Sequence, residues 1–190
     1  MPPNSRNLGC RVGLERGKSL VIADDDPAYK RGLVAAFERR GYRVRTVDSL
    51  RQLEQLLQSE CLGYATVELK LRSHSGLECI RTLRAFDPGI RIVVLTAYPS
   101  IATAVAAMKM GACNYLPKPS SADQIEAALQ RVEGNAAIPT GARRISLKSQ
   151  EWEWINAALV ESDFNVSETA RRLGMHRRTL ARKLRRPPVR

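Results

Sequence analysis

Long apolar segments are missing from this sequence. A membrane-spanning helix needs about 18 to 20 consecutive apolar residues, and no run of that length occurs although 44% of the 190 residues are hydrophobic. The apolar segment of a secretory signal is also missing from the N-terminal end. We therefore expect no membrane contact, a cytoplasmic location, and a disordered leader over residues 1–17.

Few residues suit a metal centre or a disulfide framework. The only histidines are His74 and His176, and the four cysteines are scattered without a C-x-x-C pair. This spacing argues against a zinc site, and the chain is too long and too poor in cysteine for a disulfide scaffold. Three of the four cysteines lie among apolar residues, so we expect these three to be reduced core thiols.

Common motifs of catalysis are missing as well. The sequence has no glycine-rich phosphate loop, no Ser-His-Asp set and no cluster of histidine metal ligands. We therefore do not expect an enzyme.

Positive charge is in excess, and most of the excess lies near the C-terminus. Residues 141–190 carry 12 Lys and Arg against 5 Asp and Glu, a net charge of +7. Residues 18–133 carry 16 against 13, a net charge of +3 on more than twice the length. This asymmetry predicts a polyanionic partner for the C-terminal part, with nucleic acid as the first candidate.

Short apolar runs alternate with helical patterns over the first two thirds of the chain. The runs predict five strands: 19–23, 43–47, 63–69, 91–96 and 113–117. The segments between and after them predict five helices: 27–40, around 50–57, 76–86, 100–110 and 122–131. Five β-α units with short connections predict an α/β domain over residues 18–133, a five-stranded parallel sheet of the doubly wound, flavodoxin-like kind.

The remaining residues predict a linker and a small helical domain. The stretch 134–144 is poor in large apolar residues and contains glycine and proline, as linkers do. Helices are expected around 152–160, over 167–173 and over 177–186, with a tight turn at Gly174. We predict an all-α helix-turn-helix domain over residues 145–186, followed by a tail over 187–190.

Polar residues end the predicted strands. Asp24, Asp25 and Asp26 follow the first strand, Glu68 ends the third, Thr96 ends the fourth, and Lys118 follows the fifth. The carboxyl ends of parallel strands share one crevice, so we expect five polar groups to converge there, including three or four carboxylates. Clustered carboxylates repel one another unless a cation lies among them, and Mg²⁺ prefers such oxygen ligands. A Mg²⁺ ion and the ammonium of Lys118 are the expected positive charges.

This pattern resembles the receiver domain of two-component response regulators. The matching residues are Asp24-Asp25, Glu68, Thr96-Ala97, Tyr115 and Lys118-Pro119. The resemblance implies that Asp24, Asp25 and Glu68 hold Mg²⁺ and that Glu68 occupies the position phosphorylated by a sensor histidine kinase. It also implies that Thr96, Tyr115 and Lys118 form the switch, and that the Lys118-Pro119 peptide bond is cis.

Glu68 departs from the family, whose phosphoacceptor is Asp. The extra methylene moves the carboxylate outward by about 1.5 Å, and phosphoryl transfer depends on positioning. Three interpretations stay open. The domain is a ligand-independent pseudo-receiver in which Glu68 reaches toward Thr96 and Lys118 and partly imitates an acyl phosphate. Alternatively, Glu68 is a poor but real phosphoacceptor, or the crevice serves only packing and dimer contacts.

The segment from 165 to 184 carries the second motif. Leu180 and Leu184, four residues apart, should pack on the preceding helix and leave the basic residues facing solvent. In a helix-turn-helix the second helix enters the major groove. We assign base contacts to His176, Arg177, Arg178 and Arg182, and phosphate contacts to Thr179, Lys183, Arg185 and Arg186.

This second motif resembles the Fis-type helix-turn-helix, and the whole chain resembles the RegA/PrrA/ActR/RoxR group of response regulators. The resemblance implies a dimeric transcriptional regulator in a phosphorelay, connected with redox or energy metabolism. Trp152, Ile155 and Leu159 are either a dimer interface or the module's own core. One alternative is a nucleoid-type or interaction protein that uses the receiver only to dimerise. A Mg²⁺-dependent phosphatase is the alternative from another class, although its chemistry also requires an Asp nucleophile.

Overall fold

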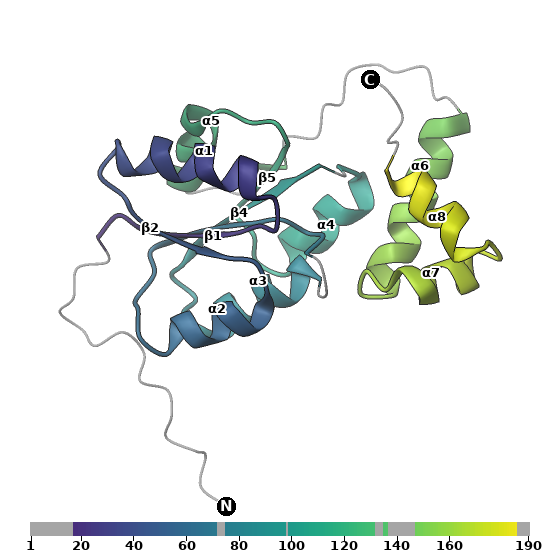
Figure 1. The fold of residues 1–190 in the computed structure, drawn as a ribbon, viewed down its shortest axis with the longest axis horizontal. Helices are drawn as coiled ribbons and strands as arrows, with labels where there is room; N and C mark the ends of the chain where they lie inside the picture. The colour runs from purple at the N-terminus through teal and green to yellow at the C-terminus, as the bar shows by residue number, and fades with distance from the viewer. Residues whose placement is uncertain (1–16, 72–74, 98, 132–134, 137–146, 186–190) are drawn as a thin grey trace, which may run out of the picture.

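The computed structural model describes residues 17–71, 75–97, 99–131, 135–136 and 147–185 (Figure 1). Almost all of the predicted leader, the predicted tail and the predicted DNA contact Arg186 lie outside the described residues.

The N-terminal domain is a parallel sheet with helices on both faces, which confirms the predicted fold class. The strand order is β2-β1-β3-β4-β5-β6, and every pairing is parallel. The strand β6, only two residues long, falls within the range predicted to be a linker and extends the sheet beyond β5. The strands are β1 (Ser19–Ala23), β2 (Arg43–Val47), β3 (Tyr64–Val67), β4 (Arg91–Thr96), β5 (Asn114–Pro117) and β6 (Asn135–Ala136).

Two apolar clusters attach the helices to the two faces of the sheet. Helices α1 and α5 pack on one face and helices α2, α3 and α4 on the other (Figure 1). Alternate residues of a strand point to opposite faces, so Leu20 and Ile22 join one cluster while Val21 and Ala23 join the other. These helices are α1 (Pro27–Glu38), α2 (Leu50–Leu57), α3 (Gly76–Phe86), α4 (Ile101–Lys109) and α5 (Ala122–Gln130).

Local capping explains where these helices begin. Asp26 and the serines at positions 49, 75, 100 and 121 each accept hydrogen bonds from backbone N–H groups in the first turn of the next helix. Gly41, just after α1, has a φ of 79°, a conformation that a residue with a Cβ rarely adopts.

The C-terminal module has a small core of its own. It consists of α6 (Leu147–Glu161), α7 (Val166–Arg172) and α8 (Arg177–Leu184). Leu180 and Leu184 are buried as predicted, with Ala170 beside them. Trp152, Ile155 and Leu159 of α6 pack in the same cluster, so the structure places them in the core of the module.

The cysteines differ from expectation at one position. Cys79 is a buried free thiol and Cys113 a half-buried free thiol, but Cys61 is disulfide-bonded, so the expected reduced state is wrong for Cys61. In the described part of the chain, no helix combines the length and apolar character needed to cross a membrane.

Candidate functional site

The carboxyl ends of the strands bring the predicted polar residues together. Asp24, Glu68 and Thr96 are 2%, 4% and 0% exposed, so all three lie inside the protein at this edge of the sheet. Lys118 reaches them from the residue after β5. Its Nζ lies 2.5 Å from Asp24 Oδ2 and 2.9 Å from Glu68 Oε2.

The Glu68 carboxylate receives donors from three separate loops. Oε1 accepts a hydrogen bond from the backbone N–H of Lys70 at 3.3 Å, and Oε2 accepts one from the backbone N–H of Ala97, also at 3.3 Å. The Lys118 ammonium is the third donor. This is an anion-binding pocket, and the anion inside it is the side chain of Glu68 itself.

Lys118 supplies the positive charge of the crevice. Burial lowers the pKa of its ammonium, but attraction to Glu68 and Asp24 outweighs burial, so the net pKa is raised. The ammonium also lies 4.6 Å from the centre of the Tyr29 ring, within the range of a cation–π contact. Lys118 therefore stays charged and allows two buried carboxylates to stay close together.

The three aspartates after β1 separate into different roles. Asp24 enters the crevice, whereas Asp26 is exposed and caps α1 by accepting from the N–H groups of Ala28 and Tyr29. Those two hydrogen bonds lower the pKa of Asp26. Asp26 therefore stays outside the crevice, because capping the helix satisfies two N–H groups that have no partner within it. Asp25 is half-buried.

The crevice as arranged does not fit a divalent ion. Among the described residues, no three His, Cys, Asp or Glu side chains gather closely enough to hold a metal. The Lys118 ammonium already bridges Asp24 and Glu68 and neutralises them. Receiver-type carboxylate sets suit Mg²⁺ chemically, so a Mg²⁺ site at Asp24, Asp25 and Glu68 remains a prediction that requires Lys118 to move.

Tyr115 connects this edge of the sheet to the first turn of α4. Its side chain is 1% exposed and its hydroxyl lies 2.7 Å from Thr103 Oγ1. The N–H of Ser100 donates to the same hydroxyl at 3.3 Å. Burial raises the pKa of Tyr115 to about 12. The ring therefore lies inside the domain next to α4 instead of on the surface. The Lys118-Pro119 peptide bond, just beyond β5, is cis.

Sequence reasoning missed several groups that shape the crevice. The donors on Glu68 from Lys70 and Ala97 are backbone N–H groups, which any residue type could supply. Gly76 was not singled out either, yet a Cβ at that position would lie 2.1 Å from the carbonyl oxygen of Glu68. Its N–H donates to the carbonyl of Leu69 at 2.8 Å. Only glycine allows α3 to begin this close to the loop after β3.

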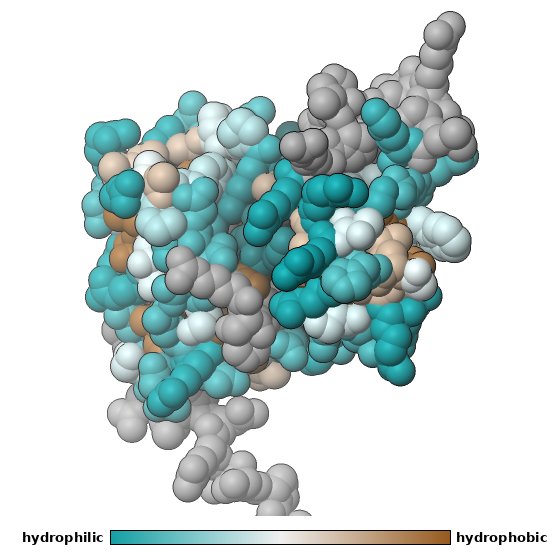
Figure 2. Space-filling model, turned by 45° about the vertical axis from the view of Figure 1, so that its right-hand side comes forward, coloured by the Kyte–Doolittle hydropathy of each residue, from teal (hydrophilic) through white to brown (hydrophobic). Residues whose placement is uncertain are grey.

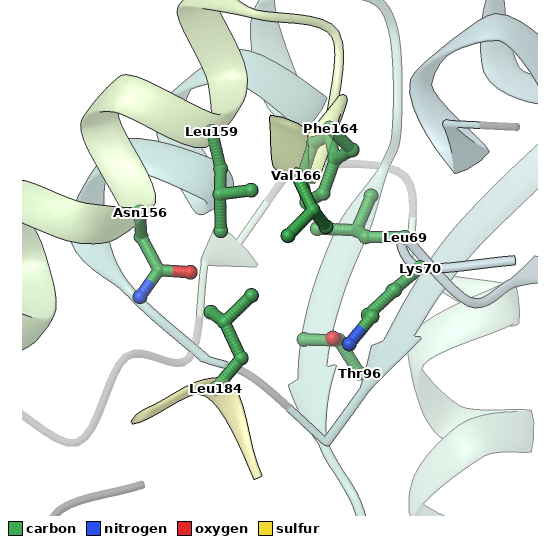
Figure 3. A pocket seen from close by; sticks show the side chains of 8 residues that line it. All are labelled: Leu69, Lys70, Thr96, Asn156, Leu159, Phe164, Val166 and Leu184. Atoms are coloured by element: carbon green, nitrogen blue, oxygen red, sulfur yellow. The ribbon is translucent and has the colours of Figure 1, made fainter. Parts of the chain in front are cut away.

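The C-terminal module packs against the same rim. Helix α6 lies beside α4 (Figure 1). The indole Nε1 of Trp152 donates to the carbonyl of Pro99 at 3.1 Å, and the N–H of Ile101 donates to Glu153 Oε2 at 3.0 Å. A small cavity lies between the two domains (Figure 3). It is lined by Leu69, Lys70 and Thr96 from the sheet domain and by Asn156, Leu159, Phe164, Val166 and Leu184 from the module.

Helix α8 presents most of the predicted DNA contacts to solvent. His176 caps the helix, and its Nδ1 accepts from the N–H of Arg178 at 3.2 Å. Thr179 is half-buried, and half-buried Lys183 forms an ion pair with Glu151 of α6 at 2.7 Å. Figure 2 shows hydrophilic side chains gathered on the side of the molecule where the module lies. The exposed members of the predicted set are His176, Arg177, Arg178, Arg182 and Arg185.

Both domains match known families. Residues 20–130 match the family described as the response regulator receiver domain. Residues 146–186 match the family described as bacterial regulatory protein, Fis family.

Relatives share nearly the whole chain. The photosynthetic apparatus regulatory protein RegA of Rhodobacter capsulatus is 44% identical over 165 residues, which are 87% of this chain and 89% of the relative. The acid tolerance regulatory protein ActR of Rhizobium meliloti is 42% identical over 165 residues, 87% of this chain and 84% of the relative.

Two solved structures resemble the chain as well. A response regulator from Burkholderia pseudomallei, described as holding a phosphorylated aspartic acid, a calcium ion and citrate, is 43% identical with a TM-score of 0.60. The match covers 86% of this chain and 96% of that one. The beryllofluoride-activated NtrC4 receiver domain dimer is 26% identical with a TM-score of 0.56, covering 59% and 93%.

Proposed function

The chain belongs to the response regulators that join a receiver domain to a Fis-type DNA-binding domain, and we propose that Glu68 holds its switch in one state without phosphorylation. As a member of this family it is a transcriptional regulator of a two-component system and not an enzyme. The proposal concerns what the receiver does when its acceptor position is Glu68.

The arrangement around Glu68 carries this proposal. Its carboxylate accepts from the N–H groups of Lys70 and Ala97 and pairs with Lys118. Donors of this kind, converging on one point, are what a phosphoryl group on a shorter carboxylate would require. The extra methylene of Glu68 places a negative charge among them without any transferred group.

The imitation of a phosphorylated residue is incomplete. A carboxylate carries one negative charge, whereas a phosphoryl group carries nearly two and has three acceptor oxygens. We therefore expect an intermediate level of activation that does not depend on a phosphate donor. The Burkholderia pseudomallei relative carries a phosphorylated aspartic acid, so the family chemistry is expected to return when Glu68 is replaced by Asp.

The partners follow from the two domains. We propose that the Fis-type module binds double-stranded DNA through His176, Arg177, Arg178 and Arg182 at base edges, and through Thr179, Lys183, Arg185 and Arg186 at phosphates. A sensor histidine kinase and a second copy of the chain are the remaining proposed partners. The NtrC4 receiver described as a dimer supports the second copy.

The domain boundaries and the biological setting are part of the proposal. The family matches over 20–130 and 146–186 support a division into domains at 18–133 and 145–186. The name of RegA, which refers to the photosynthetic apparatus, supports control of redox or energy metabolism, and we place this regulation in the cytoplasm.

A side-by-side comparison of the native chain with Glu68→Asp tests the proposal. DNA affinity of each protein is measured with and without acetyl phosphate, and intact-mass spectrometry records any phosphoryl adduct. We expect acetyl phosphate to leave the DNA affinity of the native chain unchanged and to raise the DNA affinity of Glu68→Asp. Glu68→Ala is the control that removes the charge, and it should bind DNA more weakly than the native chain. Equally strong responses of the native chain and Glu68→Asp would overturn the proposal.

A further inference from the structure

We infer that α6 couples the receiver to the DNA-binding helix α8. Trp152 and Glu153 of α6 form hydrogen bonds with Pro99 and Ile101, which lie between the Glu68 crevice and α4. The inference deepens the proposed function by naming how the crevice and the module communicate. It concerns the contact between the domains and holds whichever state Glu68 produces.

Two neighbouring side chains of α6 hold this segment by its backbone. The indole N–H of Trp152 donates to the carbonyl of Pro99, and Glu153 accepts the N–H of Ile101. Ile101 is the first residue of α4, where N–H groups lack partners within the helix and the helix dipole favours a negative charge. The carboxylate of Glu153 therefore acts as a cap supplied by the other domain.

The residues that α6 binds, Pro99 and Ile101, follow directly after the crevice in the chain. The N–H of Ala97 donates to Glu68, and Pro99 is only two residues further along the chain. Ser100 caps α4 and donates its N–H to the buried hydroxyl of Tyr115. Ala97 and the backbone groups that α6 binds are therefore within four positions of one another in the chain, and we expect a displacement of Ala97 by Glu68 to reach them.

Helix α6 also packs against α8, the proposed DNA-binding helix. Trp152 is 6% exposed and packs in one apolar cluster with Leu180 and Leu184 of α8. Leu184 also lines the cavity that Thr96 and Leu69 line from the receiver side (Figure 3). Trp152, which binds the receiver at Pro99, thus also supports the position of α8.

The docked arrangement leaves the DNA-binding side chains accessible. Arg177, Arg178 and Arg182 are exposed while α6 contacts α4. The contact is therefore compatible with DNA binding and does not cover the proposed base-reading residues. The inference requires the docked module to bind DNA more tightly than a released one, and because coupling between two sites is reciprocal, DNA on α8 should then stabilise the α6–α4 contact.

Hydrogen exchange on the full-length chain tests this coupling. The probe is a DNA duplex selected from random sequences for binding to the native protein and used at saturation. In the native chain, DNA should slow amide exchange at Ser100 and Ile101. In Glu153→Ala the Ile101 amide should exchange on the order of tenfold faster without DNA, because a charge-assisted hydrogen bond is lost. DNA should produce no slowing there.

Glu151→Ala is the matched control. It removes the same charge from the same helix, but Glu151 pairs with Lys183 inside the module. The DNA-induced slowing at Ser100 and Ile101 should persist in this variant. Trp152→Phe, which keeps a buried ring and removes only the donor to Pro99, should weaken the slowing, whereas Glu153→Ala removes it at Ile101.

Two results would overturn the inference. One is that DNA leaves the amide exchange of Ser100 and Ile101 unchanged in the native chain. The other is that DNA slows this exchange as much in Glu153→Ala as in the native chain. Neither measurement uses a phosphate donor or a Glu68 variant. Failure of the coupling is therefore distinguishable from failure of the pseudo-receiver proposal.

Discussion

At the scale of single residues, Lys118 is the ammonium that allows Asp24 and Glu68 to remain charged while buried. Its Nζ contacts both carboxylates, which are 3% and 5% exposed as side chains. Removing one member of a buried ionic group leaves the others without compensation. The stability of the receiver should therefore be sensitive to this position.

Replacing Lys118 by Met keeps the length of the side chain and removes its charge. We expect the free energy of unfolding at neutral pH to fall by about 3–5 kcal/mol, the usual cost of breaking a buried ion pair. Mg²⁺ should also raise the unfolding midpoint of the variant more than that of the native chain, since the carboxylates then lack a cation. Urea unfolding measures these changes.

Lys109→Met is the control for Lys118→Met, since Lys109 is exposed on α4. A surface substitution of this kind usually changes stability by less than about 0.5 kcal/mol. Equal losses in the two variants would show that Lys118 has no special role.

Tyr115 makes the stability depend on alkaline pH. Burial raises its pKa to about 12, against 10.0 for an ordinary tyrosine. Between these two pH values the unfolded chain loses the phenolic proton while the folded chain keeps it, so stability should fall as pH rises through this window. Tyr115→Phe should reduce this fall without abolishing it, because the pKa of Tyr42 is also raised to about 12. Unfolding midpoints from pH 9 upward provide the measurement, and an identical pH dependence in the variant would contradict the prediction.

At the scale of elements, α6 serves both the module core and the receiver. Asn156 lies on this helix with 0% exposure, and its Nδ2 donates to the carbonyl of Trp152 at 2.8 Å. Within the described part of the chain, its Oδ1 has no hydrogen-bond partner. The side chain borders the cavity between the domains, among Leu159, Phe164 and Leu184 (Figure 3).

Asn156→Leu should therefore stabilise the protein. A buried polar atom without a partner costs about 1–3 kcal/mol, and Leu has the same branched shape and suits the apolar surroundings. The variant also loses the hydrogen bond from Asn156 to the carbonyl of Trp152, which offsets part of this gain. We therefore expect the free energy of unfolding, measured by chemical denaturation, to rise by about 1 kcal/mol. Asn156→Asp, which buries a charge instead, should lower stability. A leucine variant less stable than the native chain would show that the amide is satisfied in solution.

At the scale of the whole molecule, the net positive charge is distributed unequally between the two domains. The segment 141–190 has a net charge of +7, and the receiver range 18–133 has +3. Three arginines of α8 in this smaller domain, Arg177, Arg178 and Arg182, are exposed to solvent. This distribution directs the C-terminal module toward a polyanion and leaves the receiver free for other partners.

Substitutions on α8 should separate base contacts from phosphate contacts. Arg177→Ala or Arg178→Ala should weaken binding to the selected duplex by about 1–3 kcal/mol and relax its sequence preference. Arg185→Ala should weaken binding to all duplexes alike and reduce the slope of log K against log salt by about 1. Titrations at several salt concentrations measure both quantities. A uniform loss from Arg177→Ala and Arg178→Ala would reassign these residues to phosphates.

Local patterns were sufficient for much of this architecture. The apolar runs are short-range features, so strands and helices could be predicted from them. The carboxyl-end rule for parallel sheets then predicted from the sequence that Asp24, Glu68 and Lys118 lie together. The resemblance to receivers pointed to Glu68 as the residue expected at the phosphoacceptor position.

Sequence by itself thus determined the fold class, the charged crevice, and the basic helix with Leu180 and Leu184 beneath it. Only the tertiary structure decided that backbone N–H groups of Lys70 and Ala97 bind Glu68, that Asp26 caps α1 instead, and that α6 grips the start of α4. The physical reason is that periodicity and capping are encoded in neighbouring residues. Contacts made by backbone amides, or between Glu153 and Ile101 across 52 residues, depend on how the completed elements pack.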